Sequence, residues 1–89
     1  MRNRIEDFVN QHHRFLTIED FEDYVCEEFE DIISGIYTDK EDDDYVMSFG
    51  VENDEECFEV TLTIQSCDGG IDFFGKPYNI LEIVDFSIE

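Results

Sequence analysis

Carboxylates are the side chains with which this chain could do chemistry. Of its 89 residues 25 are Asp or Glu, against five Lys or Arg and two His. Many of them gather in three stretches, at residues 17–34, 38–45 and 52–56. Carboxylates can bind a metal ion, act as general acid and base, or present negative charge to a cationic partner. Each role requires different neighbouring residues.

The stretch TDKEDDDY, residues 38–45, comes closest to a calcium-binding loop. If the EF-hand template begins at Asp39, acids fill its first, third and fifth positions. However, Asp44 stands where the template needs Gly, and Gly50 stands where it needs Glu. The adjacent His12 and His13 would point about 100° apart on a helix, so we expect one in the core and one exposed. We therefore expect no metal site.

Catalysis by paired carboxylates requires two environments that push their pKa values apart. The acids here are crowded together, and no Ser/His or Cys/His arrangement accompanies them. The glycines of DGGID, residues 68–72, lack the context of a phosphate loop and indicate a turn. We predict no catalytic residue and no cofactor, and so no enzyme.

The first acidic stretch, residues 17–34, is predicted to be an amphipathic helix. Thr17 is a suitable N-cap, Asp20 follows three residues later, and Ser34-Gly35 supplies a stop. An apolar arc of roughly 80° faces an acidic arc of about 120° on the helical wheel. The apolar arc holds Ile18, Phe21, Val25, Phe29 and Ile32, and the acidic arc holds Glu19, Asp20, Asp23, Glu27, Glu30 and Asp31. Like charges four residues apart destabilise a helix by about 0.2–0.5 kcal/mol per pair. A face that only maintained solubility would not need to accept this destabilisation.

The remaining pattern predicts an α+β fold, with two N-terminal helices packed on a three- to four-stranded antiparallel sheet. A short first helix is expected within residues 3–13, and the second helix within 18–33. Period-two alternation predicts strands in the segments 45–51, 58–65 and 80–88, the last with either partial two-sided burial or a bulge. A fourth short strand is expected in 35–38 or 71–74, a charged loop at 38–45, and an irregular connection at 66–77. We expect a single domain over residues 1–89.

The formal charge of −20 narrows the choice of partner. Such a charge repels nucleic acid and anionic membranes and attracts cationic surfaces. No apolar run approaches the roughly 20 residues of a membrane span. The three cysteines, Cys26, Cys57 and Cys67, lack metal-ligand spacing and predict reduced, mostly buried side chains in a cytoplasmic protein.

The acidic helix has the charge spacing of DNA. From Glu19 to Asp31 the axis rises about 18 Å, so six carboxylates average roughly one per 3.6 Å. One strand of B-DNA carries a phosphate about every 3.4 Å. The acidic face would therefore present to a basic groove a row of negative charges spaced like the phosphates of duplex DNA.

In length, charge and its carboxylate helix followed by strands, the chain resembles the small acidic DNA-mimic inhibitors of bacterial viruses. That class includes anti-restriction proteins, anti-CRISPR proteins and the uracil-DNA glycosylase inhibitor. The resemblance implies a stoichiometric inhibitor that occupies the basic DNA-binding site of a restriction or CRISPR nuclease in the cytoplasm of an infected bacterial host cell. The partner-binding candidates are Glu19, Asp20, Asp23, Glu27, Glu30, Asp31, Asp42, Asp43, Asp44 and Tyr24, with residues 52–56 as another possible acidic row.

Two alternatives remain open on the sequence. Residues 36–45 are similar to acidic loops of nuclease immunity proteins, an all-helical class that binds one nuclease through a shaped interface. Tyr24, Tyr37 or Tyr45 would then be the aromatic anchor. The other alternative is an acidic structural or adaptor module whose charge maintains solubility. Homodimerisation is open in each case.

Overall fold

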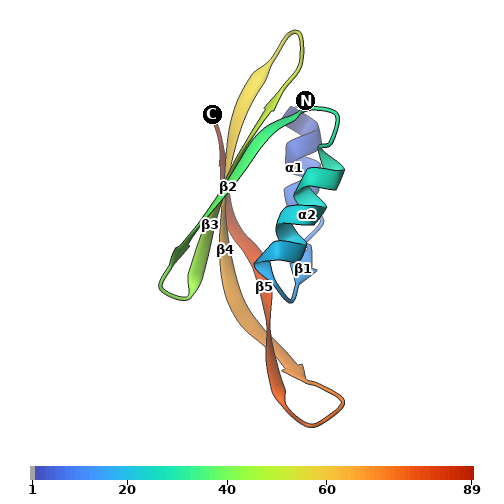
Figure 1. Ribbon diagram of the computed structural model, residues 1–89, viewed down its shortest axis with the longest axis vertical. Coiled ribbons are helices and arrows are strands. Elements are labelled where there is room, and N and C mark those ends of the chain that lie inside the picture. The colour runs from blue at the N-terminus through green and yellow to red at the C-terminus, as the bar shows by residue number, and fades with distance from the viewer. Residues whose placement is uncertain (1) are drawn as a thin grey trace.

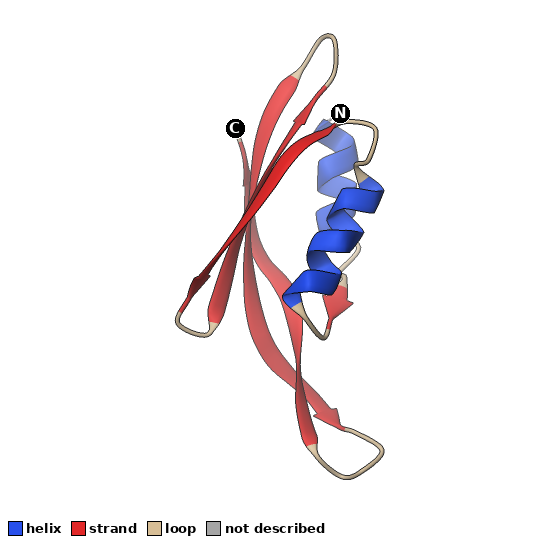
Figure 2. Cartoon of the chain, viewed as in Figure 1, coloured by secondary structure: helices blue, strands red, loops and turns tan. Residues whose placement is uncertain are grey.

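Two N-terminal helices cover one face of a five-stranded antiparallel sheet in the computed structural model, which describes residues 2–89 (Figures 1 and 2). The sheet order is β1-β5-β4-β3-β2. The α+β prediction is confirmed, but the sheet has five strands instead of three to four. The elements are α1 Arg2–Asn10, β1 Arg14–Phe15, α2 Ile18–Glu28, β2 Ile33–Glu41, β3 Asp44–Glu52, β4 Cys57–Ile71 and β5 Pro77–Ile88.

Strict alternation places the apolar side chains of β3 and β4 in the core. Met47, Phe49 and Val51 of β3 are buried, as are Val60, Leu62 and Ile64 of β4. The helices complete the core with Ile5, Phe8 and Val9 from α1 and Phe21 and Val25 from α2. These faces agree with the sequence pattern because period two and period 3.6 report local geometry directly.

A bulge corrects the phase of β5. Leu62 pairs with Phe86, yet Ile64 pairs with Ile83, so β5 carries an extra residue between these positions. Leu81 and Ile83 before the bulge therefore share the core side with Phe86 after it. Of the two alternatives that the sequence left open, the bulge is the one found, and it explains why apolar residues occupy both phases of this strand.

α2 ends at Glu28, not near residue 33 as predicted. Phe29 is the C-cap (φ −112°, ψ 24°), and a turn leads to β2 at Ile33. Phe29 is fully buried, with its ring centroid 5.4 Å from that of Phe49. The β-branched pair Ile32-Ile33 favours a strand, and the backbone turns toward the sheet before Ser34-Gly35 is reached.

Two predicted loops are largely strand. The charged stretch 38–45 belongs to a tight β2–β3 hairpin that turns at Asp42 and Asp43, and Asp42 adopts a left-handed φ of 53° that Asp tolerates. The expected extra strand at 35–38 is part of β2. The connection 66–77 is paired up to Ile71 and again from Pro77. Its alternation is weak because no helix covers it.

The two adjacent histidines follow the first helix. α1 ends at Asn10, so His12 and His13 follow the helix; His12 is exposed, and the His13 ring lies 4.8 Å from that of Phe8. One core-facing and one exposed histidine were expected, and this is confirmed.

All three cysteines are free, and Cys26 and Cys67 are half-buried. Cys57 is exposed at the start of β4, against the expectation of burial, because its side chain lies on the uncovered face of the sheet.

Candidate partner-binding surface

The outward side of α2 is an acidic surface. Glu19, Asp20, Asp23 and Glu27 are all exposed on it, and Glu28 at the last position is exposed as well. The Thr17 hydroxyl accepts a hydrogen bond from the Asp20 N–H at 3.2 Å, which confirms the predicted N-cap. Glu19 and Asp20 lie in the first turn, where the helix dipole favours anions. Glu27 and Glu28 lie at the C-terminal end of α2, where the helix dipole does not favour anions.

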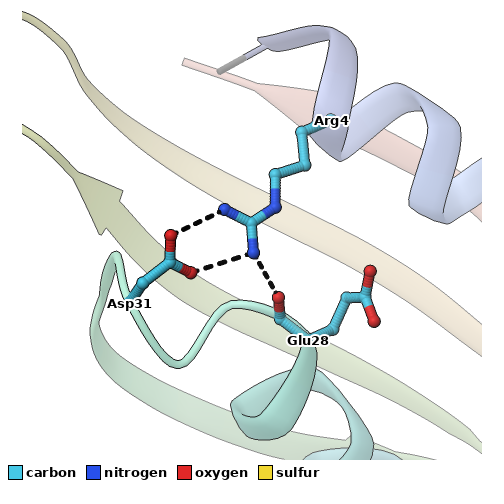
Figure 3. A network of polar contacts seen from close by, with 3 residues as sticks. All are labelled: Arg4, Glu28 and Asp31. Atoms are coloured by element: carbon cyan, nitrogen blue, oxygen red, sulfur yellow. Dashed lines mark hydrogen bonds and ion pairs between the residues drawn. The ribbon is translucent and has the colours of Figure 1, made fainter.

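Glu30 and Asp31 do not belong to the helical face. Both were expected on it, but they lie in the turn that follows Glu28, and Glu30 is exposed there. Arg4 of α1 binds Asp31 through both guanidinium branches, at 2.9 and 3.0 Å (Figure 3). Hydrogen bonding from Arg4 is the main reason that the pKa of Asp31 is lowered below its usual value. The charge of Asp31 is thus paired within the molecule.

Arg4 also terminates α2. Its guanidinium donates to the carbonyl oxygen of Glu28, one of the acceptors that a helix end leaves without an N–H (Figure 3). The same guanidinium lies 5.3 Å from the centre of the Phe29 ring. A cation at this end also opposes the negative pole of the helix dipole. α2 contains no Lys or Arg, so the cation at its end comes from α1.

The other N-terminal arginines also face acids of the same molecule. Arg2 lies 3.4 Å from Glu6 on α1, and Arg14 of β1 lies 2.9 Å from Glu82 of β5. With Arg4 and Asp31, these pairs engage every arginine of the chain. None of them lies on the outward side of α2.

The start of α2 and the β2–β3 hairpin border one groove. Glu19 lines it from the helix, and Asp43 and Tyr45 line it from the hairpin. The structure therefore brings one candidate acid of α2 and one of the stretch 42–44 to the same cavity. Lys40 also lines the groove, with its ammonium 5.8 Å from the centre of the Tyr45 ring. Asp42 is exposed at the hairpin turn and Asp44 is half-buried at the start of β3.

The third acidic stretch lies at the opposite end of the sheet, in the β3–β4 turn (Figure 1). The side-chain oxygen of Asn53 accepts hydrogen bonds from the N–H groups of Glu55 and Glu56, at 2.8 and 2.7 Å, which orders the turn. The N–H of Glu52 donates to the carbonyl of Ile32 at 2.9 Å and links this end to the segment after α2. Acidic turns thus lie toward both ends of the α2 surface.

The three candidate tyrosines differ in their exposure to solvent. The Tyr24 ring is half-buried, with its centroid 4.7 Å from that of His13 and 5.3 Å from that of Phe15. Tyr45 is half-buried, whereas Tyr37 is 65% exposed on the edge strand β2. Tyr37 is therefore the tyrosine most open to a partner.

Sequence reasoning missed an apolar cluster at the β4–β5 turn. Phe73 and Phe74 are 98% and 83% exposed, and Ile71 beside them is 72% exposed. The adjacent phenylalanines next to turn-forming residues, in DFFGKP, were the available signal. Residues 66–77 were predicted to be an irregular connection, so no exposed apolar cluster was predicted there.

Within residues 2–89, no three His, Cys, Asp or Glu side chains are grouped so that they could hold a metal ion. In the same range, neither helix is long and apolar enough to cross a membrane. Comparisons with protein-family models, with curated proteins and with solved structures gave no match.

Proposed function

We propose that the protein is a DNA mimic that occupies the basic DNA-binding site of a bacterial defence nuclease, of a restriction or CRISPR system, and inhibits it stoichiometrically. The observation that carries the proposal is the exposed carboxylate surface of α2, from which every arginine is withdrawn. The acids of the two hairpin turns extend this surface. The chain presents anions and keeps its guanidinium groups for its own fold.

The shortened helix keeps the spacing of the acids close to that of DNA. Glu19, Asp20, Asp23 and Glu27 span eight helical steps, or about 12 Å, which gives an average spacing of roughly one carboxylate per 4 Å. A DNA strand carries one phosphate per about 3.4 Å. Acids on two other elements, at Asp43 and in the β3–β4 turn, supply charge beyond a single row.

The test is inhibition of DNA cleavage by purified bacterial restriction and CRISPR nucleases, titrated with the protein at several salt concentrations. The logarithm of the affinity should fall steeply with the logarithm of the salt concentration, because salt screens the attraction between acidic and basic surfaces. Inhibition that stays flat between about 50 and 500 mM NaCl would count against mimicry. So would failure to inhibit any nuclease of the panel.

A nuclease immunity protein is the second candidate, and the exposure of Tyr37 favours it. An aromatic anchor in a shaped interface contributes affinity that depends little on salt. In that case Tyr37→Ser should weaken inhibition by at least about thirtyfold. A DNA mimic predicts little change for the same variant. Tyr37 lies on the face of the sheet opposite to Ile36 and Phe49, which pack in the core, and so opposite to the helices.

A further inference from the structure

The β4–β5 hairpin extends beyond the rest of the sheet. The last residue of β4 paired with β3 is Gln65, and β1 pairs with β5 no farther than Leu81. Residues 67–80, here called the finger, therefore pair only with each other (Figure 1). A two-stranded ribbon of this kind carries no core of its own.

The finger has a structured aromatic tip. Oδ1 of Asp72 accepts hydrogen bonds from the N–H groups of Phe74 and Lys76, both at 2.9 Å, and Gly75 supplies the left-handed φ of 78° that closes the turn. The Phe73 and Phe74 rings lie edge to face, 5.6 Å apart. This turn holds two nearly fully exposed rings in place. Paired aromatic side chains in one exposed patch mark an interaction site more often than scattered ones do.

A groove lies beside the finger. Phe15 and Leu16 line it from β1 and the residue that follows, and Ile71, Tyr78 and Ile80 line it from the finger. Leu16 is 65% exposed and Tyr78 is 38% exposed. Arg14 and Asp72 are the charged residues of its lining. The molecule thus carries a convex apolar tip next to a concave apolar groove.

The finger carries little of the charge of the molecule. It contains two acids, Asp68 and Asp72, and one base, Lys76, so it contributes −1 to the total of −20. Two copies that met through the finger would bring together segments of low net charge. Insertion of the tip into an anionic membrane would instead draw the acidic body toward like charge.

We propose that the finger and the groove form a symmetric dimer interface, in which the tip of each copy fills the groove of the other. Such an isologous contact is self-complementary because each patch meets the other twice. The two rings of a tip offer about 300–500 Å². Two tips seated in two grooves of similar area bury roughly 1,200–2,000 Å², the size of a specific interface. Contact between the tips alone would bury about half as much. This inference does not depend on the proposed nuclease target.

Salt should strengthen the dimer. Two bodies of like charge repel each other, and added salt screens that repulsion while leaving apolar burial intact. The sign is opposite to that expected for binding to a basic partner. The salt dependence therefore separates the two interactions without a third component.

The experiment is sedimentation equilibrium of the purified protein from about 1 to 100 µM, at about 50 and 500 mM NaCl. The wild type should dimerise, more tightly at high salt. The tip variant F73S/F74S should weaken dimerisation at least about a hundredfold, since the tip contributes two aromatic anchors to each half of the interface. Tyr37→Ser, an exposed aromatic residue outside the finger, is the matched control and should leave the dimer unchanged.

A mixing experiment tests the pairing of tip with groove. Leu16→Ser damages the groove but leaves the tip intact, so alone it should also lose the dimer. A mixture of the tip variant and the groove variant retains one intact tip and groove contact per heterodimer and should associate more tightly than either variant alone. Circular dichroism and the melting temperature check that each variant is folded. A monomeric wild type at high salt, a tip variant that still dimerises, a dimer unaffected by Leu16→Ser, or a mixture without rescue would each overturn the proposal.

Discussion

At the scale of single residues, Arg4 does most to reconcile the acidic chain with a stable fold. It binds Asp31, donates to the Glu28 carbonyl and lies over the Phe29 ring. Its contacts join the turn after α2 to α1, 27 residues away. Sequence reasoning predicted the Thr17 cap because a cap is local. It could not predict the Arg4–Asp31 pair, because that contact depends on how the two helices pack.

Removing Arg4 should destabilise the protein. Arg4→Ala leaves the Glu28 carbonyl and the end of the helix without their cation, and the melting temperature should fall by about 5 °C at neutral pH. Arg2→Ala removes an arginine from the same helix, but one engaged only with Glu6 at 3.4 Å. That control should change the melting temperature by less than half as much. Equal effects for the two variants would show that Arg4 has no special role.

The contribution of the Arg4–Asp31 pair should depend on pH in one direction. Because the folded pKa of Asp31 lies below the usual 3.8, the stabilisation is fully present above that value and is lost as the pH falls through the folded pKa. The difference in melting temperature between wild type and Asp31→Asn should therefore stay constant from neutral pH to about 5. It should shrink at more acidic pH, and a difference that grew there would contradict the assignment.

At the scale of elements, the periodic faces of helices and strands could be predicted from the sequence, but the positions where elements end could not. The helical positions Ile18, Phe21 and Val25 and the alternation of β3 and β4 were correctly assigned, because a face needs only its own period. Phe29 and Ile32, also predicted on the apolar arc, lie beyond the helix. The end of α2 was wrong because burial of Phe29 and the β-branched Ile32-Ile33 outweighed the stop signal at Gly35. The finger was missed because it packs against no helix and has no pattern of burial.

Reversing charge on α2 separates function from stability. D23K/E27K turns the repulsion between Glu19 and Asp23 into attraction and places a cation in the last turn, so the fold should be as stable or gain up to about 1 kcal/mol. Nuclease inhibition should weaken at least about a hundredfold, because lysines would face a basic surface.

E59K/D85K is the matched control, since these two strand residues lie on the face of the sheet that the helices leave uncovered. It changes the net charge equally and should weaken inhibition far less. If both double variants lose inhibition to the same extent, total charge and not the α2 surface determines binding. If D23K/E27K inhibits like the wild type, the acids of the hairpin turns would have to bind the target alone.

At the scale of the whole molecule, a charge of −20 on an 89-residue chain opposes folding through repulsion among its own carboxylates. Raising NaCl from about 50 to 500 mM should therefore raise the melting temperature. D23K/E27K reduces the net negative charge from −20 to −16, so its melting temperature should rise less with added salt. A wild-type melting temperature that falls with added NaCl would show that the carboxylates do not repel one another strongly enough to matter.

If the protein takes the place of DNA, the two must compete for one site on the nuclease. A purified nuclease that the protein inhibits is bound to a fluorescent DNA duplex without the metal ion needed for cleavage. The protein is then added while anisotropy reports bound DNA. The DNA should be displaced completely, and the apparent dissociation constant of the nuclease for DNA should rise linearly with the concentration of free inhibitor. A stable ternary complex of nuclease, DNA and protein would contradict the claim.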